Sequence, residues 1–592
     1  MKSYKKIAII FTALGAIAAT GCKKILDQEP KSNITPNVLA SQGGVVGGLA
    51  GVYSDLRNLW GTEGFMYYTN LGVDETLAGG GASSSGSNFA TYKNYTNNIS
   101  EVYNPLYGVF GIAYQDINTL NGVLEYGPAA FADERTRTAY LAQAKFLRAF
   151  YYYHLVQTFG DVPLHTTFIN TATRSDSRAP IADVYAQIIK DLTEASTELQ
   201  TKPGENASPF GGHAATKASA LYLLSKTYLS RGWSKAAQTD DFSNSLATAQ
   251  KLINERATYG KGLYQNYADA YNPANEATNM ESLFAIERST DPKYGDFVPG
   301  NSGGKANGWA YFFRPNYPTV TANYPTNSGA SVMTRDISNG RPFFRVRPNY
   351  DYVNNVAFND KTNDFRYWNT FQTTWIANTA NVTTPRGALT VGVDTAIWMP
   401  PYDPGAAKRA AFKGVVFLPP SVAATASGVN ANASTNTFFP AVKKFDDPNR
   451  PAVNDPSSRP AVLFRFSEVY LIAAEAAFKM GDLNTAAEMI NVLRTRAAYR
   501  PNNMPANAVA NMQVTPGQIT IDFILDERTR ELYGESLRWW DLARTQSLIR
   551  RVKQYNAEAG PNIQEHMILR PIPQTQIQLV TQGPPFPQNP GF

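Results

Sequence analysis

Cysteine is almost absent from this chain of 592 residues, which contains only one, Cys22. A single thiol cannot form a disulfide within the chain, and if Cys22 is modified no free thiol remains. A fold outside the cytoplasm would therefore depend on its apolar core alone. A chain of this length can readily bury a core of sufficient size.

Long hydrophobic runs are also scarce, and the longest lies near the N-terminus at 7–20. Three lysines precede it, it is too short to span a bilayer as a mature helix, and small residues lead from it directly to Cys22. This order predicts a lipoprotein signal peptide over 1–21, acylation of Cys22, and a tether over 22–35. The alternative is an ordinary secretory signal, because Ala19 stands where lipoprotein sites usually carry leucine.

Histidine is scarce as well, with four residues, at 154, 165, 213 and 566, in different segments. None has the i, i+4 partner or the glutamate that a zinc site on a helix needs. The sequence also has no glycine-rich phosphate loop after a strand and no G-x-S-x-G elbow. We therefore expect no metal site, no cofactor and no enzyme activity. A surface glycan hydrolase stays open as an alternative, since two well-placed carboxylates among 48 acidic residues would suffice.

Neither sign of charge dominates the chain. Without the three lysines of the predicted signal peptide, 51 basic residues remain against 48 acidic ones, with no basic block or stripe. The chain therefore lacks the electrostatic footprint of a nucleic-acid-binding protein. Aromatic residues are abundant instead, because 33 Tyr, 31 Phe and 8 Trp make up 12% of the chain. Such a composition suits stacking against uncharged ligands.

Helical periodicity is clear in three parts of the chain. In the first, Ala142, Phe146, Ala149 and Tyr153 recur at intervals of four, three and four residues, so small and large side chains alternate on one face. Alternation of this kind suits the packing of paired helices. The helix should end near Gly160, because glycine can adopt a left-handed cap.

A second helical pair is predicted over 213–230 and the helix that follows, and a third over 461–497. In the third pair the polar residues of 462–479 fall within a narrow arc of the helix, and Gly481 then breaks the chain. Two helices per unit indicate a tetratricopeptide-like arrangement. The predicted fold class is mainly α, an α-α superhelix of tetratricopeptide-like pairs. The polar residues of the arc are Arg465, Glu468, Glu475 and Lys479.

Two stretches interrupt the helical pattern. Residues 74–104 contain glycine and serine triplets followed by aromatic residues, which predicts a long surface loop. Residues 260–460 are rich in Pro, Gly, Asn and aromatics, which predicts a loop-rich, ligand-facing insertion with short strands. The expected organisation is thus helical pairs over 36–259, the insertion, and a further helical pair with the chain ending over 461–592.

The segment richest in charge lies near the C-terminus and is better explained by structure than by catalysis. Opposite charges at helical spacing stabilise a helix, and adjacent tryptophans favour core positions. The expected features are pairs of Asp526 with Arg530 and of Asp541 with Arg544, and burial of Trp539 and Trp540.

Several segments occur in an order and spacing that one known family shares. They are KFLRAFYYYHLVQTFGDVPL (145–164), VYAQIIKDLTEA (184–195), LFRFSEVYLIAAEAAFKMGD (463–482), INVLRTRA (490–497), ILDERTRELYGESLRWWDLART (524–545), LRPIPQTQI (569–577) and the terminal QNPGF (588–592). With the acylation site and the following Ile25-Leu26-Asp27 and Pro30, they resemble the SusD/RagB family of Bacteroidetes-type outer-membrane lipoproteins. The insertion is similar only in its aromatic richness.

This resemblance implies a body of tetratricopeptide-like helical pairs with an inserted ligand-facing lobe. It also implies a lipid-anchored, surface-exposed protein of the cell outer membrane that captures oligo- or polysaccharide. The glycan would be delivered to a SusC-like TonB-dependent transporter, which would be the protein partner. Some members handle peptides instead, so peptide binding or a purely scaffolding role remains open.

Candidate ligand-binding residues come from the first loop and from the insertion. Sugars suit flat aromatic faces flanked by side chains that bond to hydroxyl groups, and both regions offer that mixture. The resemblance places the ligand face on these same two parts of the chain. Each aromatic side chain could equally fill loop packing. The candidates are Tyr92, Asn94, Tyr95 and Asn97 in the loop and Trp309, Tyr311 and Arg314 in the insertion.

Overall fold

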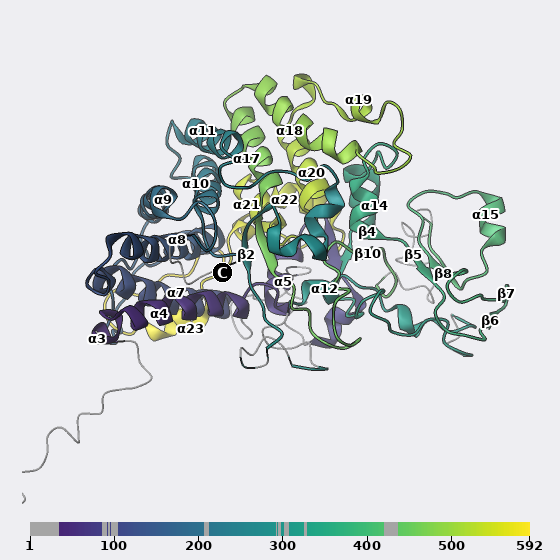
Figure 1. Ribbon diagram of the computed structural model, residues 1–592, viewed down its shortest axis with the longest axis horizontal. Helices are drawn as coiled ribbons and strands as arrows, with labels where there is room; N and C mark the ends of the chain where they lie inside the picture. The colour runs from purple at the N-terminus through teal and green to yellow at the C-terminus, as the bar shows by residue number, and fades with distance from the viewer. Residues whose placement is uncertain are drawn as a thin grey trace, which may run out of the picture.

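The computed structural model is elongated, with stacked helices at one end and a loop-rich lobe with short strands at the other (Figure 1). Cys22, the predicted signal peptide and nearly all of the predicted tether lie outside the described residues. Among the residues that are described, no helix is both long and apolar enough to cross a bilayer. The structure describes residues 35–85, 92, 95, 105–205, 212–291, 293, 298–300, 307–324, 328–419 and 436–592.

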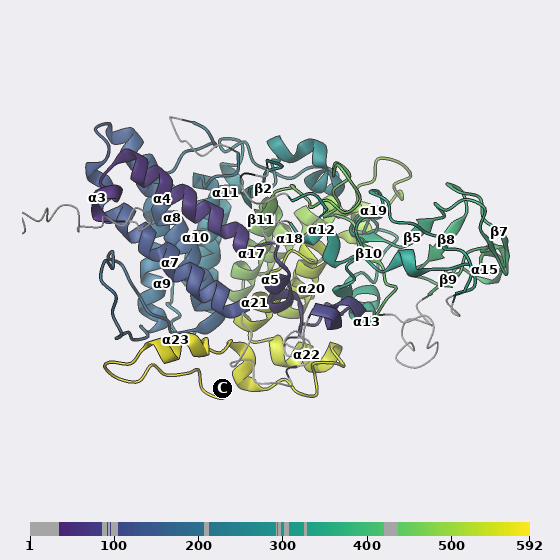
Figure 2. The same ribbon diagram turned by 90° about the horizontal axis from the view of Figure 1, so that it is seen from below.

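The N-terminal half is a row of helices that pack largely in chain order (Figure 2). Their bounds are α3 Pro36–Leu39, α4 Gln42–Asp55, α5 Glu63–Asn70, α7 Pro105–Tyr126, α8 Glu134–Phe159, α9 Ile181–Glu198, α10 Lys217–Gly232 and α11 Asp241–Asn254. Helix α7 packs against α4 and α8, α8 against α9, and α10 against both α9 and α11. Side-chain caps start several of them, as where Asp133 accepts from the Thr136 N–H at 2.7 Å.

The predicted packing face of α8 is confirmed. Ala142, Phe146 and Ala149 are completely buried, and Tyr153 is 4% exposed. The helix ends at Gly160, whose φ of 75° is a conformation that favours glycine. The sequence pattern thus located the end of this helix, but burial is not confined to the predicted face, because every residue of 146–156 is buried.

The third predicted pair continues the same row of helices. It consists of α17 (Phe466–Lys479) and α18 (Leu483–Ala498), which pack against each other, while α11 packs against α17. Helices on either side of the long insertion are therefore neighbours in space (Figure 1). The mainly helical, tetratricopeptide-like fold class is confirmed.

One helix boundary was wrong, because residues 461–465 form the strand β11 (Ala461–Arg465) and not the start of a helix. This strand pairs antiparallel with β2 (Ser282–Ile286). Its residues are AVLFR, of which all but Val462 are buried, and a short run that is mostly apolar and mostly buried does not distinguish strand from helix by its periodicity. This pairing brings the two ends of the insertion together beside the helical body.

The polar arc of α17 is largely buried, although such an arc usually faces solvent. Glu468 accepts from Lys226 Nζ at 2.8 Å and also contacts Arg528. Glu475 accepts from Trp233 Nε1 and from Arg544 Nη2, each at 2.8 Å. The helices that follow α18 supply Arg528 and Arg544, so the arc is covered by ion pairs.

These C-terminal helices lie against the stack and carry buried charges. Trp539 and Trp540 are 0% and 6% exposed, and Asp541 pairs with Arg544 at 2.9 Å, as predicted. The predicted pair of Asp526 with Arg530 was wrong, because Arg530 pairs with Glu527 at 2.9 Å and Asp526 with Arg551 at 2.6 Å. Tertiary packing brings Arg551 to Asp526. The helices are α19 Ala508–Met512, α20 Ile521–Leu532, α21 Arg538–Arg544, α22 Leu548–Tyr555 and α23 Gln574–Leu579.

The insertion contains the short strands that the sequence predicts, and it has a core of its own around the fully buried Trp375. Its sheets are β5-β8-β9, with β8 and β9 parallel, and the pairs β4-β10 and β6-β7. The strands are β3 Val346–Pro348, β4 Phe371–Gln372, β5 Thr374–Ile376, β6 Thr383–Thr384, β7 Gly387–Ala388, β8 Thr395–Trp398, β9 Val416–Phe417 and β10 Ala441–Val442. The short helices are α12 Trp309–Phe312, α13 Tyr350–Tyr352, α14 Arg366–Thr370 and α15 Ala406–Ala411.

Single turns of 3₁₀ helix, and one π turn, η8, join these elements. They are η1 Leu56–Asn58, η2 Gly80–Ser85, η3 Gly127–Ala129, η4 Tyr267–Tyr271, η5 Pro273–Thr278, η7 Tyr317–Thr319, η8 Val353–Ala357, η9 Pro516–Gln518 and η10 Glu565–Ile568. Of these, η4 and η5 form one wall of the pocket described next.

Candidate ligand-binding site

The two regions expected to face ligand lie side by side. Strand β1 (Thr76–Ala78), at the start of the first loop, pairs antiparallel with β3 in the insertion. The glycines that follow continue the contact, because the Gly81 N–H donates to the Phe344 carbonyl at 3.0 Å. A Cβ on Gly79 would lie 2.1 Å from the Phe344 carbonyl oxygen, so only glycine fits this approach.

Two aromatic residues of the first loop point into the protein. Tyr92 and Tyr95 are 2% and 4% exposed, and the Arg570 guanidinium lies 5.1 and 5.8 Å from their ring centres. The Tyr95 hydroxyl donates to the Gly72 carbonyl at 2.9 Å, and burial raises the pKa of Tyr92 to about 12. These rings anchor the loop. Asn94 and Asn97, predicted beside them, lie outside the described residues.

Tyr311 and Arg314 are also buried. The Tyr311 hydroxyl contacts the backbone of Asp455 and of Ser457. Arg314 donates from Nη1 to Gln372 Oε1 at 2.7 Å and pairs with Asp446, and burial lowers its pKa to about 10. In this structure both side chains hold segments of the insertion together.

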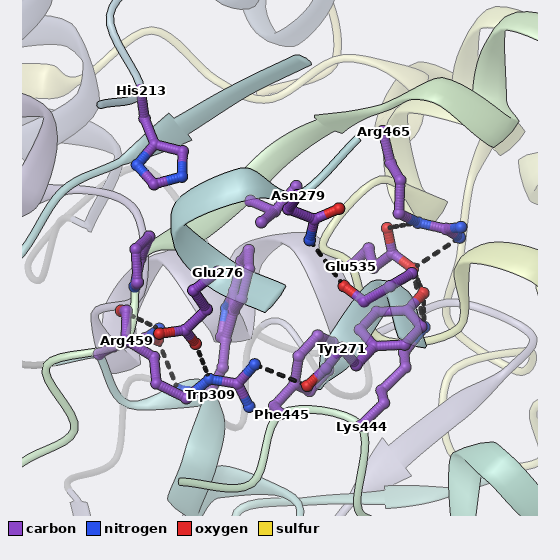
Figure 3. Close-up of a pocket in the computed structure, with 14 residues that line it drawn as sticks. His213, Tyr271, Glu276, Asn279, Trp309, Lys444, Phe445, Arg459, Arg465 and Glu535 are labelled. Carbon is purple, nitrogen blue, oxygen red and sulfur yellow. Dashed lines mark hydrogen bonds and ion pairs between the residues drawn. The ribbon is translucent and has the colours of Figure 1, made fainter. Parts of the chain in front are cut away.

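Trp309, in contrast, lines a pocket between the insertion and the helical body (Figure 3). The pocket is narrow, with a volume of about 50 Å³, which is room for a few water molecules. Trp309 is 2% exposed, and its Nε1 has no hydrogen-bond partner within the described part of the chain. A buried N–H without an acceptor is costly, so this donor is available to an oxygen of a ligand or a water.

Further aromatic and amide groups surround Trp309. The Phe445 ring lies 5.3 Å from the Trp309 ring, and Tyr271 lies on the same side of the pocket. Asn279 and Asn307 contribute amide groups that are held in place by bonds to backbone carbonyls at 2.9 and 3.1 Å. This is the combination of aromatic faces and fixed amides that was expected for a sugar site.

Every cation of the pocket has a carboxylate partner. Arg459 pairs with Glu276, while Lys444 and Arg465 pair with Glu535 at 2.8 and 3.2 Å (Figure 3). Arg465 also pairs with Glu281 at 2.9 Å and with Glu531 at 2.7 Å, two buried acids behind the pocket wall, so no cation of the pocket is left unpaired, which favours a neutral ligand.

The Glu535 carboxylate does not have the raised pKa of a glycosidase acid. Burial opposes the ionisation of Glu535, but Arg465 and Lys444 outweigh it and lower its pKa below the ordinary value. A general acid in glycoside hydrolysis needs a raised pKa. No group of three or more His, Cys, Asp or Glu side chains that could hold a metal ion occurs within the described ranges. The arrangement therefore suits binding.

No pattern in the sequence identifies most of this pocket. Tyr271, the adjacent Lys444 and Phe445, and Glu535 come from three separate segments, and the Tyr271 hydroxyl donates to Glu535 at 2.8 Å across 264 positions of the chain. Only the high aromatic content of the insertion indicated that this region contains a binding site. Of the predicted site residues that the structure describes, Trp309 is the one on the pocket wall.

Comparisons with known proteins agree with this architecture. A family model described as "SusD family" matches residues 281–592, and one described as "Starch-binding associating with outer membrane" matches residues 26–229. The chain is 26% identical to "SusD-like protein P2" of Formosa agariphila over 499 residues, covering 81% of this chain and 79% of the relative.

Solved structures share the fold. A SusD homolog from Bacteroides thetaiotaomicron has a TM-score of 0.66 at 20% identity, covering 93% of this chain and 97% of its own. A laminarin-binding SusD-like protein has a TM-score of 0.61 at 20% identity and is matched over its whole length, with 93% of this chain covered. The surface glycan-binding protein A of Bacteroides fluxus has a TM-score of 0.62 at 17% identity, covering 93% of this chain and 100% of its own.

Proposed function

Because the chain belongs to the SusD family, we propose that it is a cell-surface glycan-binding protein that captures oligo- or polysaccharide. The observation that carries this proposal is the pocket at the junction of the helical body and the insertion. There a tryptophan N–H without a partner in the described chain lies among aromatic rings and fixed amides. Two structural neighbours, one a laminarin-binding protein and one a surface glycan-binding protein, support the same class of ligand.

The proposal assigns different roles to the predicted site residues. Trp309 contacts the ligand directly, through its ring and through Nε1. Tyr95 and Arg314 position the surrounding segments, since both are buried against protein. Tyr92 and Tyr311 act in the same way. Asn94 and Asn97 remain predicted ligand contacts.

The finer parts of the proposal concern attachment and partner. The protein is anchored by acylated Cys22 in the outer membrane and faces outward. It passes its glycan to a SusC-like TonB-dependent transporter. Affinity at one site is weak, and repeated contacts along a polymer, together with many copies on the surface, retain the ligand.

A glycan and peptide array tests the ligand class. Protein lacking residues 1–22 is applied to neutral and acidic glycans and to peptides, and every bound polysaccharide is then incubated with the protein and sized. Retention on glycans without shortening supports the proposal. Shortening would favour the hydrolase, and binding to peptides alone would favour the peptide-binding alternative.

The partner is tested with the full-length lipidated chain. Solubilised membranes are passed over the tagged protein, and co-purification of a large barrel of the SusC type is expected. A barrel that co-purifies while the array shows no ligand of any kind would favour a scaffold role.

A further inference from the structure

A second, larger cleft lies where the C-terminal ends of α8 and α10 meet the last residues of the chain. Its volume is about 650 Å³, within the range of about 300–1,000 Å³ typical of small-ligand pockets. It shares no lining residue with the pocket around Trp309. The cleft is therefore a separate candidate site.

The walls of this cleft are fixed in place. Asn589, near the chain end, donates from Nδ2 to the Phe159 carbonyl at 2.9 Å and to the Arg570 carbonyl at 2.8 Å. Arg178 donates to the Pro587 carbonyl at 3.2 Å and to the Asn589 side chain. The C-terminal segment is thus held against the end of α8 by hydrogen bonds to the Phe159 and Arg570 carbonyls and from Arg178.

The cleft carries positive charge that is not fully compensated. Arg178 donates to two further acceptors, the carbonyls of Asp161 and Phe159, so all four of its acceptors are neutral. The nearby Asp161 carboxylate pairs with Lys235 at 3.1 Å. One carboxylate therefore faces two cations, and burial lowers the pKa of Arg178.

Arg544, the third cation that lines the cleft, does not contribute to this uncompensated positive charge. It donates from Nη2 to Glu475 Oε2 at 2.8 Å and pairs with Asp541 at 2.9 Å. The excess charge in the cleft thus belongs to Arg178 and Lys235, and it favours a ligand with an anionic group.

Side chains with spare hydrogen-bonding capacity flank these cations. Within the described chain the Gln546 side-chain amide makes no hydrogen bond, and the backbone of this residue has a φ of 55°, which is rare for glutamine. Gln157 donates from Nε2 to the Tyr185 hydroxyl at 2.5 Å, and its Oε1 accepts nothing from the described residues. Trp233 adds an indole ring to the wall, with Lys479 Nζ 3.9 Å from its ring centre.

We propose that this cleft binds a short oligosaccharide that carries a carboxylate, such as a uronic acid unit. The carboxylate lies near Lys235 and Arg178, and the sugar hydroxyls bond to Gln546 and Gln157. This site is additional to the pocket around Trp309 and functions whether or not that pocket binds neutral glycan.

The geometry favours a sugar over an acidic peptide. One common mode of peptide binding adds the peptide as a strand to the edge of a sheet through main-chain hydrogen bonds. The described walls of this cleft are helix ends and an irregular segment, and its spare groups are on side chains. Amide side chains beside an indole ring suit hydroxyl groups and the C–H face of a sugar ring.

Calorimetric titration with trigalacturonate, and with maltotriose as the neutral trimer, tests the proposal. The wild-type protein should bind the acidic trimer more tightly. Lys235→Gln removes one exposed cation and should weaken trigalacturonate binding by about fivefold, the equivalent of about 1 kcal/mol for a partly exposed charge. Gln546→Ala should weaken it by a similar factor through loss of a hydrogen bond.

Lys251→Gln is the matched control, because Lys251 is an exposed lysine on α11 that pairs with Glu255. It should leave trigalacturonate binding unchanged, and Lys235→Gln should leave the binding of neutral array glycans unchanged. Absence of trigalacturonate binding, an equal loss in Lys251→Gln, or equal binding of an oligoglutamate peptide would overturn the proposal. None of these results bears on the neutral-glycan pocket, which Trp309 variants test separately.

Discussion

At the scale of single residues, the molecule buries an unusual amount of charge. Glu531 is completely buried and bonds to three arginines, to Arg465 Nη1 at 2.7 Å, to Arg366 Nη1 at 3.1 Å and to Arg496. These arginines lower the pKa of Glu531 well below its ordinary value, although burial opposes the shift. Such pairs tie α20 to the insertion and to α18, so the network links elements that are far apart in the chain.

Replacing this central acid should therefore be costly. Glu531→Gln leaves three buried guanidinium groups undercompensated, and we expect a loss of about 3–5 kcal/mol in the free energy of unfolding. Lys251→Gln, which breaks an exposed pair, should cost less than about 1 kcal/mol. Urea denaturation of both variants provides the measurement. Equal, small effects would show that the network contributes little to stability.

His154 is a second buried titratable residue with a measurable consequence. It lies among aromatic rings, 4.6 Å from Phe150 and 4.9 Å from Trp540, and neither ring nitrogen has a partner in the described chain. Burial lowers its pKa to about 3. The neutral, structural role fits the expectation that the histidines are not catalytic.

The pH dependence of stability follows from this shift. Between the folded pKa of about 3 and the unfolded value near 6.5 the unfolded chain binds more protons, so this residue destabilises the fold as pH falls. At pH 5 the loss relative to neutral pH should be about 2 kcal/mol. The substitution His154→Phe should abolish this contribution to the loss of stability at low pH. The thermal midpoints of the wild type and of His154→Phe, measured from pH 5 to 8, check this prediction. Plots of midpoint against pH that run parallel for the two proteins would contradict it.

At the scale of elements, the junction of β1 with β3 determines where the first loop meets the insertion. Gly79 has no space for a side chain, whereas Gly47 on α4 has nothing within 4 Å of the position that a Cβ would occupy. Gly79→Ala should separate the two strands, cost about 1–3 kcal/mol and weaken glycan binding. Gly47→Ala should leave glycan binding unchanged and should not destabilise the fold. Thermal melts and titration of the two variants are the measurements, and normal binding by Gly79→Ala would be evidence against this junction as part of the site.

The elements differ in how far the sequence predicts them. Helix α8 was predictable because small and large apolar residues recur along it at helical spacing and a glycine ends it. Strand β11 was not, because four of its five residues are buried and so short a run shows no clear alternation. The pocket was predictable only as a region, since Tyr271, Phe445 and Glu535 meet through tertiary packing.

At the scale of the whole molecule, one row of helices extends from α4 to α18, and the insertion projects from it (Figures 1 and 2). The Trp309 pocket lies where these two parts join, and the acidic-glycan cleft lies at helix ends closed by the chain terminus. Two separate sites on one chain would let a mixed polymer make more than one contact, which raises its overall retention.

The proposed membrane attachment of the whole chain depends on one residue, Cys22. Wild-type protein in its native host should incorporate labelled fatty acid and sediment with membranes. Cys22→Ser should lose the label and appear in the soluble fraction, because the proposed anchor is the acyl group on this thiol. Membrane retention of an unlabelled Cys22→Ser protein would contradict the lipid anchor.

The most direct test of the central claim compares two tryptophans. Trp309 and Trp375 are both buried with an Nε1 that lacks a partner among the described residues, but only Trp309 lines the pocket. Trp309→Phe keeps a buried ring and removes the donor, so calorimetric titration with an array-positive neutral glycan should show about tenfold weaker binding, equivalent to one hydrogen bond. Trp375→Phe should bind like the wild type. Unchanged affinity in a folded Trp309→Phe protein, or an equal loss in both variants, would contradict glycan capture at this pocket.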